Sequence, residues 1–269
     1  MLKKRIIFTL LYADGYFFQS RNYNIQKVGN IDWLFKNYDF NNISYYIDEL
    51  IILNISRKEK ENLNFIEKVE LISKNCFVPI TAGGGIQSLE IASELLSKCC
   101  DKILINSAAF EKPKILETIS KVFGQQSIIV GVDFKKDNEN FNAFINNGEK
   151  KINISFKDYI NTLKSMPFGE INLNSIDMDG TGMGLEYGVL ELIPNDFQKP
   201  IILSGGCGNA KHISYGIKNH KINAVSTSNL LNFLGDGLKR CREILISENI
   251  DFPEWNITKL RKFKNSLKE

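Results

Sequence analysis

The sequence is short of histidine, of paired cysteines and of long apolar runs. Only two histidines, His212 and His220, occur in 269 residues, which argues against a histidine-based metal site or a catalytic triad. Its five cysteines are odd in number, form no C-x-x-C pair and follow no signal peptide, so we expect free thiols in a reducing cytoplasm. No stretch reaches the roughly 18 apolar residues of a membrane span, and we expect none.

An excess of charge of one sign is also missing. Lysine and arginine number 34 against 31 acidic residues, and a net charge of +3 is too small to indicate a nucleic-acid partner. The length suits one α/β barrel of about 250 residues, and no break in composition suggests a second domain. The basic segment Lys259–Lys268 is most simply a solvated end. We therefore expect one domain over residues 1–269.

Short apolar runs alternate with amphipathic helical segments along the whole chain. Most runs are too apolar to have a solvated face, as is typical of buried parallel strands. Repeated strand and helix units predict a parallel α/β architecture. The predicted strands are Arg5–Leu11, Glu49–Asn54, Val78–Ala82, Lys102–Ile105, Ser127–Asp133, Glu170–Asn174, Pro200–Ser204 and Ala224–Ser226. The clearest predicted helices are Lys58–Ser73, Leu89–Leu96, Pro113–Val122 and Phe156–Ser165.

An internal repeat organises these elements. Several features recur about 121 residues apart, so four strands in one half are repeated once in the other. Such matching favours a closed barrel over an open sheet, and we predict a (β/α)8 TIM barrel. Its halves are roughly 1–122 and 123–249, with a tail at 250–269. The matched features are Glu49 and Glu170, Pro79-Ile80 and Pro200-Ile201, Gly84-Gly85 and Gly205-Gly206, and Asn106-Ser107 and Thr227-Ser228.

Two insertions follow predicted strands, so both lie at the C-terminal face of the barrel, where active sites sit. Residues Asp14–Phe35 predict a long loop rich in tyrosine, phenylalanine and asparagine. Residues Lys136–Ile154 predict a small hairpin.

Glycine pairs at two matched strand ends indicate phosphate binding. Glycine lets the backbone pass close to a ligand, and N–H groups there can hold phosphate oxygens. One such run is open to a simple turn, but two on opposite sides of a barrel mouth imply a long substrate with a phosphate at each end. The candidate phosphate-binding residues are Gly84, Gly85, Asn106, Ser107, Asp179, Gly180, Thr181, Gly205, Gly206, Ser228 and Asn229.

Charged residues stand at both ends of the predicted strands. Asp133 ends an apolar strand, where a carboxylate faces the barrel mouth and acid or base chemistry is its expected use. A helix cap or a salt bridge is the alternative for Asp133. The acidic, glycine-rich segment Ser175–Gly184 predicts a loop over the ligand. At the opposite strand ends, four residues predict an ion-paired ring whose simplest role is stability: Arg5, Glu49, Lys102 and Glu170.

Together these residues resemble the cyclase subunit of imidazole glycerol phosphate synthase, a histidine-biosynthesis barrel, from Met1 to about Asn249. The motifs that carry the resemblance are Lys4-Arg5-Ile6-Ile7, Asp14-Gly15, Ile47-Asp48-Glu49-Leu50, Ala82–Ile86, Asp101-Lys102, Ile105-Asn106, Phe123-Gly124, Asp133, Ser175–Thr181 and Ser204-Gly205-Gly206.

The resemblance implies a glutaminase subunit that docks at the barrel bottom as a heterodimer and releases ammonia there. It further implies that ammonia passes the charged ring as a gate, travels up the barrel and attacks a bis-phosphate ribulosyl-ribonucleotide. Two aspartates then split the intermediate into imidazole glycerol phosphate and AICAR, and no metal or organic cofactor is implied.

The sequence departs from that family at its first catalytic aspartate. Leu11 occupies this position, and a leucine cannot transfer a proton. Losing one of two acid or base groups typically costs about 10²–10⁴-fold in rate. Gln19 replaces a substrate-binding lysine and Asn54 replaces an aspartate, whereas Asp133 and Asp179 remain.

Three functions stay open. In the first, a divergent subunit still conducts ammonia from a glutaminase, for an acceptor such as a sugar of surface-glycan synthesis and in company with a third, amidating enzyme. The others are a working histidine-pathway cyclase and a non-catalytic scaffold or regulator of a glutaminase. Retention of the ring and both glycine pockets beside loss of the first-half acid favours the first.

Overall fold

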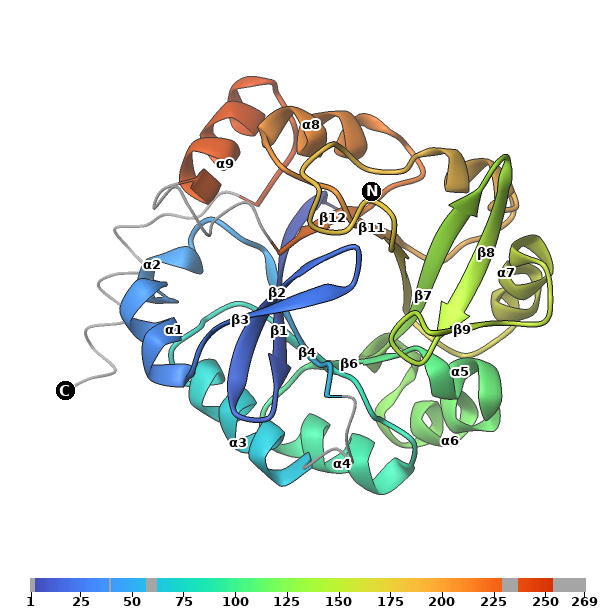
Figure 1. Cartoon of the computed structure of the whole chain (residues 1–269), viewed down its shortest axis with the longest axis horizontal. Coiled ribbons are helices and arrows are strands. Elements are labelled where there is room, and N and C mark those ends of the chain that lie inside the picture. The colour runs from blue at the N-terminus through green and yellow to red at the C-terminus, as the bar shows by residue number, and fades with distance from the viewer. Residues whose placement is uncertain (1–2, 39, 57–61, 229–236, 254–269) are drawn as a thin grey trace.

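Eight parallel strands close into a barrel. The computed structural model describes residues 3–38, 40–56, 62–228 and 237–253. The strands pair in the order β1, β4, β5, β6, β7, β10, β11, β12, and β12 returns to β1 (Figure 1). The predicted TIM barrel is therefore confirmed. The barrel strands are β1 (Arg5–Ala13), β4 (Glu49–Asn54), β5 (Ile80–Gly83), β6 (Lys102–Ile105), β7 (Ile128–Asp137), β10 (Glu170–Ser175), β11 (Ile201–Ser204) and β12 (Ala224–Thr227).

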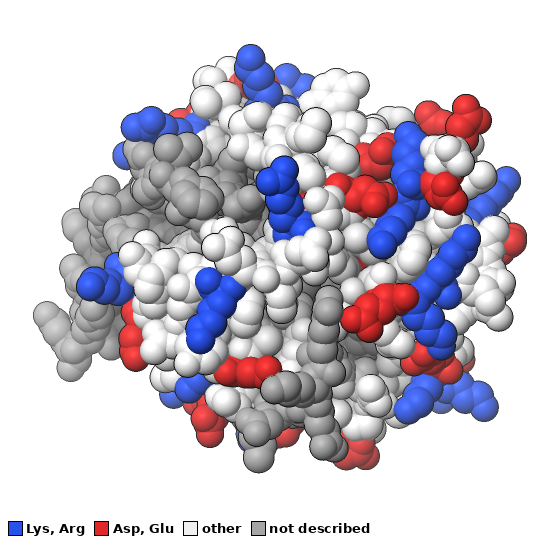
Figure 2. Space-filling model, viewed as in Figure 1, with Lys and Arg blue, Asp and Glu red and all other residues white. Residues whose placement is uncertain are grey.

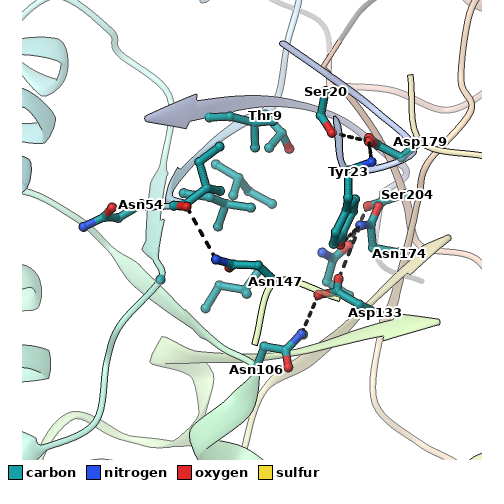
Figure 3. A pocket seen from close by; sticks show the side chains of 18 of the residues that line it. Thr9, Ser20, Tyr23, Asn54, Asn106, Asp133, Asn147, Asn174, Asp179 and Ser204 are labelled. Atoms are coloured by element: carbon teal, nitrogen blue, oxygen red, sulfur yellow. Dashed lines mark hydrogen bonds between the residues drawn. The ribbon is translucent and has the colours of Figure 1, made fainter. Parts of the chain in front are cut away.

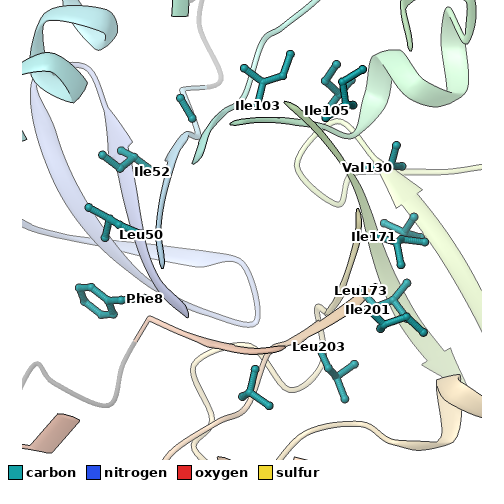
Figure 4. Packing of buried hydrophobic residues seen from close by; sticks show 14 of the residues in the cluster. Phe8, Leu50, Ile52, Ile103, Ile105, Val130, Ile171, Leu173, Ile201 and Leu203 are labelled. Atoms are coloured by element: carbon teal, nitrogen blue, oxygen red, sulfur yellow. The ribbon is translucent and has the colours of Figure 1, made fainter. Parts of the chain in front are cut away.

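Helices lie around the outside of this ring of strands (Figure 1). They pack on apolar side chains such as Leu50, Ile103 and Val130, which point away from the barrel axis in Figure 4. The helices are α1 (Ile31–Asn37), α2 (Phe40–Ile43), α3 (Asn62–Ser73), α4 (Leu89–Lys98), α5 (Ser107–Glu111), α6 (Lys114–Phe123), α7 (Phe156–Lys164), α8 (Ala210–Lys218) and α9 (Gly237–Ser247), with short 3-10 helices η1 (Gln125–Ser127) and η2 (Gly188–Leu192).

The inside of the barrel is layered, because alternate residues of a strand face the same side. A charged ring lies at the bottom, and an apolar layer separate from the outer core lies above it. The next layer is polar: Thr9 Oγ1 lies 2.7 Å from Ser226 Oγ, and Ser204 Oγ donates to Asn172 Oδ1 at 2.6 Å. The apolar layer consists of Ile7, Ile51, Leu104, Ile129, Ile202 and Ala224, with Leu53 packed against it.

The first insertion is a hairpin, so the expectation of a long loop over Asp14–Phe35 was wrong. β2 (Tyr16–Arg21) pairs with the end of β1 and with β3 (Asn24–Gly29), and α1 follows. A two-residue turn joins β2 to β3, and both of its residues have left-handed backbones, with φ of 50° at Asn22 and 63° at Tyr23. In Figure 1 this hairpin crosses in front of the barrel strands.

The second insertion is also a hairpin, as predicted for Lys136–Ile154. β7 runs on past the barrel and pairs with β8 (Asn140–Ile145), which pairs with β9 (Lys150–Lys151). On the face seen in Figure 2, lysines alternate with acidic side chains around this hairpin, and Lys150 pairs with Glu111 at 3.3 Å.

Element boundaries differ most where β1 and β7 run on into the hairpins, to Ala13 and Asp137 rather than to Leu11 and Asp133, and two strand starts differ at prolines. The strands predicted from Val78 and Pro200 begin at Ile80 and Ile201, since proline has no N–H for the ladder. Asn229, the basic segment Lys259–Lys268 and the start of the helix predicted from Lys58 lie outside the described residues. All five cysteines are free thiols, and none of the described helices is long and apolar enough to cross a membrane.

Candidate functional site

A cavity of about 440 Å³ opens at the C-terminal ends of the strands (Figure 3). Its lining includes Ile51 and Leu104, so it reaches down to the apolar layer of the barrel. Most of its polar lining is neutral, and a cavity of this kind suits a small polar ligand. The amides and hydroxyls among the lining residues include Thr9, Asn54, Asn106, Asn147, Asn172, Asn174, Ser204 and Ser226.

The two glycine turns have the same backbone conformation and need glycine for the same reason. Gly84 and Gly205 have φ of +92° and +91°. A Cβ on Gly84 would lie 2.0 Å from the carbonyl oxygen of Asn54, and one on Gly205 would lie 2.5 Å from that of Ser175. Asn54 and Ser175 are the last residues of the matched strands β4 and β10. The twofold repeat therefore extends to the packing of both turns.

Most of the candidate phosphate-binding residues line the cavity: Gly84, Gly85, Asn106, Ser107, Asp179, Gly180, Gly205, Gly206 and Ser228. Thr181 is not among the lining residues, and its hydroxyl donates to the carbonyl of Met178 at 2.8 Å within a turn. Asn106 and Ser107 are engaged by protein groups: the Asn106 amide donates to Asp133, and Ser107 Oγ accepts from the backbone of Asn146. Phosphate binding stays a prediction.

Asp133 lies on β7 in the cavity wall with a raised pKa. Its Oδ2 accepts from Asn106 Nδ2 at 2.8 Å and its Oδ1 accepts from Asn174 Nδ2 at 3.3 Å. Burial raises the pKa of Asp133 to about 6; hydrogen bonds from Tyr23, Asn174 and Asn106 oppose this, and the charge of Asp179 adds to it. A carboxyl group with such a pKa can exchange a proton near neutral pH, as acid–base chemistry requires.

Asp179 holds the β2–β3 hairpin over the cavity. Its Oδ2 accepts from Ser20 Oγ at 2.5 Å and from the backbone N–H of Tyr23 at 3.2 Å (Figure 3). Its backbone oxygen accepts from Asn22 N at 2.8 Å. Burial raises the pKa of Asp179, and the hydrogen bonds from Ser20 and Tyr23 partly offset the rise. The hairpin donors Ser20 and Tyr23 both bind one carboxylate oxygen of Asp179, Oδ2. A phosphate contact for Asp179 stays a prediction.

The cavity wall around Leu11, where the resemblance implies an aspartate, is apolar or neutral. Leu11 lines the cavity beside Leu53, its partner on β4. Asn54 also lines it, and its Oδ1 accepts from the backbone N–H of Ser56 at 3.1 Å. Asp14 faces elsewhere: its carboxylate accepts from Ser56 Oγ at 2.9 Å beside a separate, smaller pocket. Asp14 therefore does not line the cavity beside Leu11, where the resemblance implies an aspartate.

The four charged residues at the strand starts form the predicted ion-paired ring. Arg5 donates to Glu49 and to Glu170, each at 2.5 Å, and Lys102 donates to the same carboxylates at 3.2 and 2.6 Å. Burial alone would lower the pKa of Arg5, but Glu170 and Glu49 raise it. Burial alone would raise the pKa of Glu170, but Arg5 and Lys102 lower it. Arg5 and Glu170 therefore stay charged at neutral pH. A role of the ring in ammonia passage stays a prediction.

Sequence reasoning missed the residues that the hairpins bring into the site. Tyr23 OH accepts from Asn174 Nδ2 at 2.7 Å and also hydrogen-bonds to Asp133. Gly148, in the loop between β8 and β9, packs against the ring of Tyr23. The asparagine at the Asn22-Tyr23 turn, a residue typical of two-residue hairpin loops, was the available signal.

Comparison with known proteins places this barrel in a family. The profile of the histidine biosynthesis protein family matches residues 20–233. The chain belongs to this family. It is 46% identical over 243 residues to a protein of Parasynechococcus marenigrum, named provisionally as imidazole glycerol phosphate synthase subunit hisF2, with 90% of each chain covered. It is 31% identical over 251 residues to imidazole glycerol phosphate synthase subunit HisF of Pelodictyon phaeoclathratiforme, with 93% of this chain and 98% of the relative covered.

A third relative supports the same assignment. Subunit HisF of Thermotoga sp. (strain RQ2) is 35% identical over 213 residues, which are 79% of this chain and 83% of the relative. The protein is therefore a HisF-like chain that spans nearly the length of its relatives, and the resemblance seen in the motifs is confirmed.

Proposed function

We propose that this HisF-like chain conducts ammonia from a glutaminase partner to an acceptor other than the ribulosyl-ribonucleotide, such as a sugar of surface-glycan synthesis. The observation that carries the proposal is an intact charged ring below a mouth in which Leu11 replaces the first-half acid. The relatives are named as subunits of a synthase, which supports a heterodimer with the glutaminase at the barrel bottom.

The layers inside the barrel support passage of neutral ammonia. Above the ring lies the apolar layer, and the cavity floor begins at two of its members, Ile51 and Leu104. An ammonium ion would lose its hydration in such a layer at a high cost, whereas neutral ammonia crosses it far more easily. The path from the ring to the cavity is therefore short and selects the uncharged species.

Opening the ring requires a small movement of Lys102. Its ammonium group lies 2.6 Å from Glu170 but 3.2 and 3.4 Å from the two oxygens of Glu49. Moving Lys102 toward Glu170 keeps its shortest ion pair and opens a gap beside Glu49, which Arg5 still neutralises. Binding of a partner at the strand starts would supply the cause of this movement.

A specific observation also favours a second function, the cyclase of histidine biosynthesis. Asp133 keeps a pKa of about 6 in the cavity wall, and both glycine turns keep the matched geometry expected of a ligand with two phosphates. The non-catalytic scaffold is a third function, and it requires that phosphate binding has been lost.

The deciding experiment is turnover of the ribulosyl-ribonucleotide with saturating ammonium salt and no partner. Ammonium bypasses the glutaminase, so the assay reports on the barrel mouth alone. Absence of turnover in folded protein is the expected result, whereas turnover near that of an ordinary HisF would establish the histidine reaction. Titration with a bis-phosphate ligand tests the scaffold function, because tight binding of the ligand would exclude that function.

A further inference from the structure

Tyr23 lies where the two hairpins meet the cavity wall formed by β7 and β10. It lies at the tip of the β2–β3 hairpin, yet its side chain reaches down to β7 and β10 (Figure 3). Its φ of 63° is uncommon for a bulky residue, and such a backbone persists only where the surroundings hold it in place. The contacts around Tyr23 therefore outweigh the preference of its own backbone.

Those contacts come from both insertions. The backbone N–H of Tyr23 donates to Asp179 at 3.2 Å, which ties the hairpin tip to the loop after β10. A Cβ on Gly148 would lie 2.8 Å from Cδ2 of Tyr23, so the second hairpin needs glycine there for the ring to fit. The tips of both hairpins thus pack together over the cavity, with the tyrosine ring between them and the strands.

The hydroxyl end of Tyr23 has a defined hydrogen-bond direction. The amide of Asn174 donates to the phenol oxygen at 2.7 Å, so the single hydrogen of the phenol is left for Asp133. Burial raises the pKa of Tyr23 well above its ordinary value, and the charge of Asp133 raises it further. The phenol therefore stays protonated and acts only as a donor to the carboxylate.

We propose that Tyr23 is a positioning residue for Asp133, which it holds by a phenol hydrogen bond that forms only when the β2–β3 hairpin covers the barrel mouth. The functional meaning of this contact rests on the acid–base role proposed for Asp133. The titratable and polar groups that face Asp133 are the phenol of Tyr23, the carboxylate of Asp179, and the amides of Asn106 and Asn174. No lysine or arginine of the described ranges is paired with Asp133, so these neutral donors are what favours its ionised form.

The proposal distinguishes a hydrogen-bond role of Tyr23 from a purely steric one. If the phenol holds the carboxylate, Tyr23→Phe keeps the ring and its burial but removes a donor, so the pKa of Asp133 rises. If the ring only seals the cavity, Tyr23→Phe leaves that pKa unchanged. A loosened hairpin admits water to Asp133, which lowers the pKa instead.

The experiment is a carbon-13 NMR titration of aspartate carboxyl groups in the whole chain, without partner or substrate. Asp133→Asn identifies the resonance, and Tyr16→Phe, a half-exposed tyrosine on the same hairpin, is the matched control. The expected result is a rise of about one pKa unit in Tyr23→Phe, the scale of one hydrogen bond to a charged group, and no change in Tyr16→Phe. An unchanged or lowered pKa of Asp133 in Tyr23→Phe overturns the proposal.

This titration is independent of the ammonia reaction. It needs neither a glutaminase nor an acceptor, so failure of the proposed function leaves its outcome readable. Conversely, a chain that conducts ammonia but shows no shift in Tyr23→Phe would keep the proposed function and lose the positioning role.

Discussion

Replacing Asp133 by asparagine removes an ionisation that folding disfavours. Burial raises the pKa of Asp133 from its ordinary value of 3.8 to about 6, so the folded chain binds this proton more tightly than the unfolded chain does. The free energy of unfolding therefore falls as the pH rises from about 4 to about 6, and the loss persists above that range. A shift of this size corresponds to about 3 kcal/mol, and the partial exposure of the carboxylate to the cavity makes this an upper limit.

The variant Asp133→Asn should not show this fall in the free energy of unfolding with pH. Its stability relative to the natural chain should rise by about 1–3 kcal/mol between about pH 4 and pH 7.5, whatever constant offset the new amide introduces. Urea unfolding at a series of pH values measures the difference directly. Asp137→Asn is the control, because Asp137 lies at the exposed end of the same strand. A gap between Asp133→Asn and the natural chain that is constant with pH, or that narrows as the pH rises, would refute the reasoning.

Three further predictions follow from the ring, the mouth and the glycine turns. Lys102→Ala should uncouple glutamine hydrolysis from product formation in the complex with the glutaminase, and unchanged coupling would make the ring purely structural. Leu11→Asp should raise turnover of the ribulosyl-ribonucleotide about 10-fold or more if the missing acid is the only defect, whereas no gain would indicate a wider change of the cavity. Gly205→Ala should destabilise the chain by about 1–3 kcal/mol more than Gly15→Ala in urea unfolding, because both glycines have φ near +90° but only Gly205 has an oxygen 2.5 Å from the new Cβ. Equal losses in the two glycine variants would show that strain of the backbone alone is responsible.

The barrel and its charged ring were predictable because the residue pattern of each strand and the internal repeat are visible in the sequence. Apolar runs mark strands buried on both faces. The 121-residue repeat matches the starts of β4 and β10 and the glycine turns that follow β5 and β11. The ring followed from charges at strand starts, since residues at the same end of parallel strands converge. Prolines shifted two strand starts by one or two residues, for a reason that the sequence itself contains.

The hairpin contacts were not predictable in the same way. Tyr23 reaches Asp133 across more than a hundred residues of chain, through a left-handed turn that tyrosine rarely adopts, so no propensity points to it. The turn that fixes the hydroxyl of Thr181 on the carbonyl of Met178 was likewise not predicted. Side-chain direction in loops depends on contacts made elsewhere in the fold, and periodicity does not encode it.

The pattern of change at the mouth supports ammonia delivery over random loss. Leu11 faces Leu53 across β1 and β4, and Leu53 packs on the apolar layer, so the substitution extends that layer upward on one side of the cavity. An aspartate at that position would attract ammonium and water, whereas leucine favours neutral ammonia. On the other side, Asp133 and Asp179 are both covered by the β2–β3 hairpin. The first half of the mouth thus suits passage of ammonia, while the acid–base groups of the second half line the cavity beneath the β2–β3 hairpin.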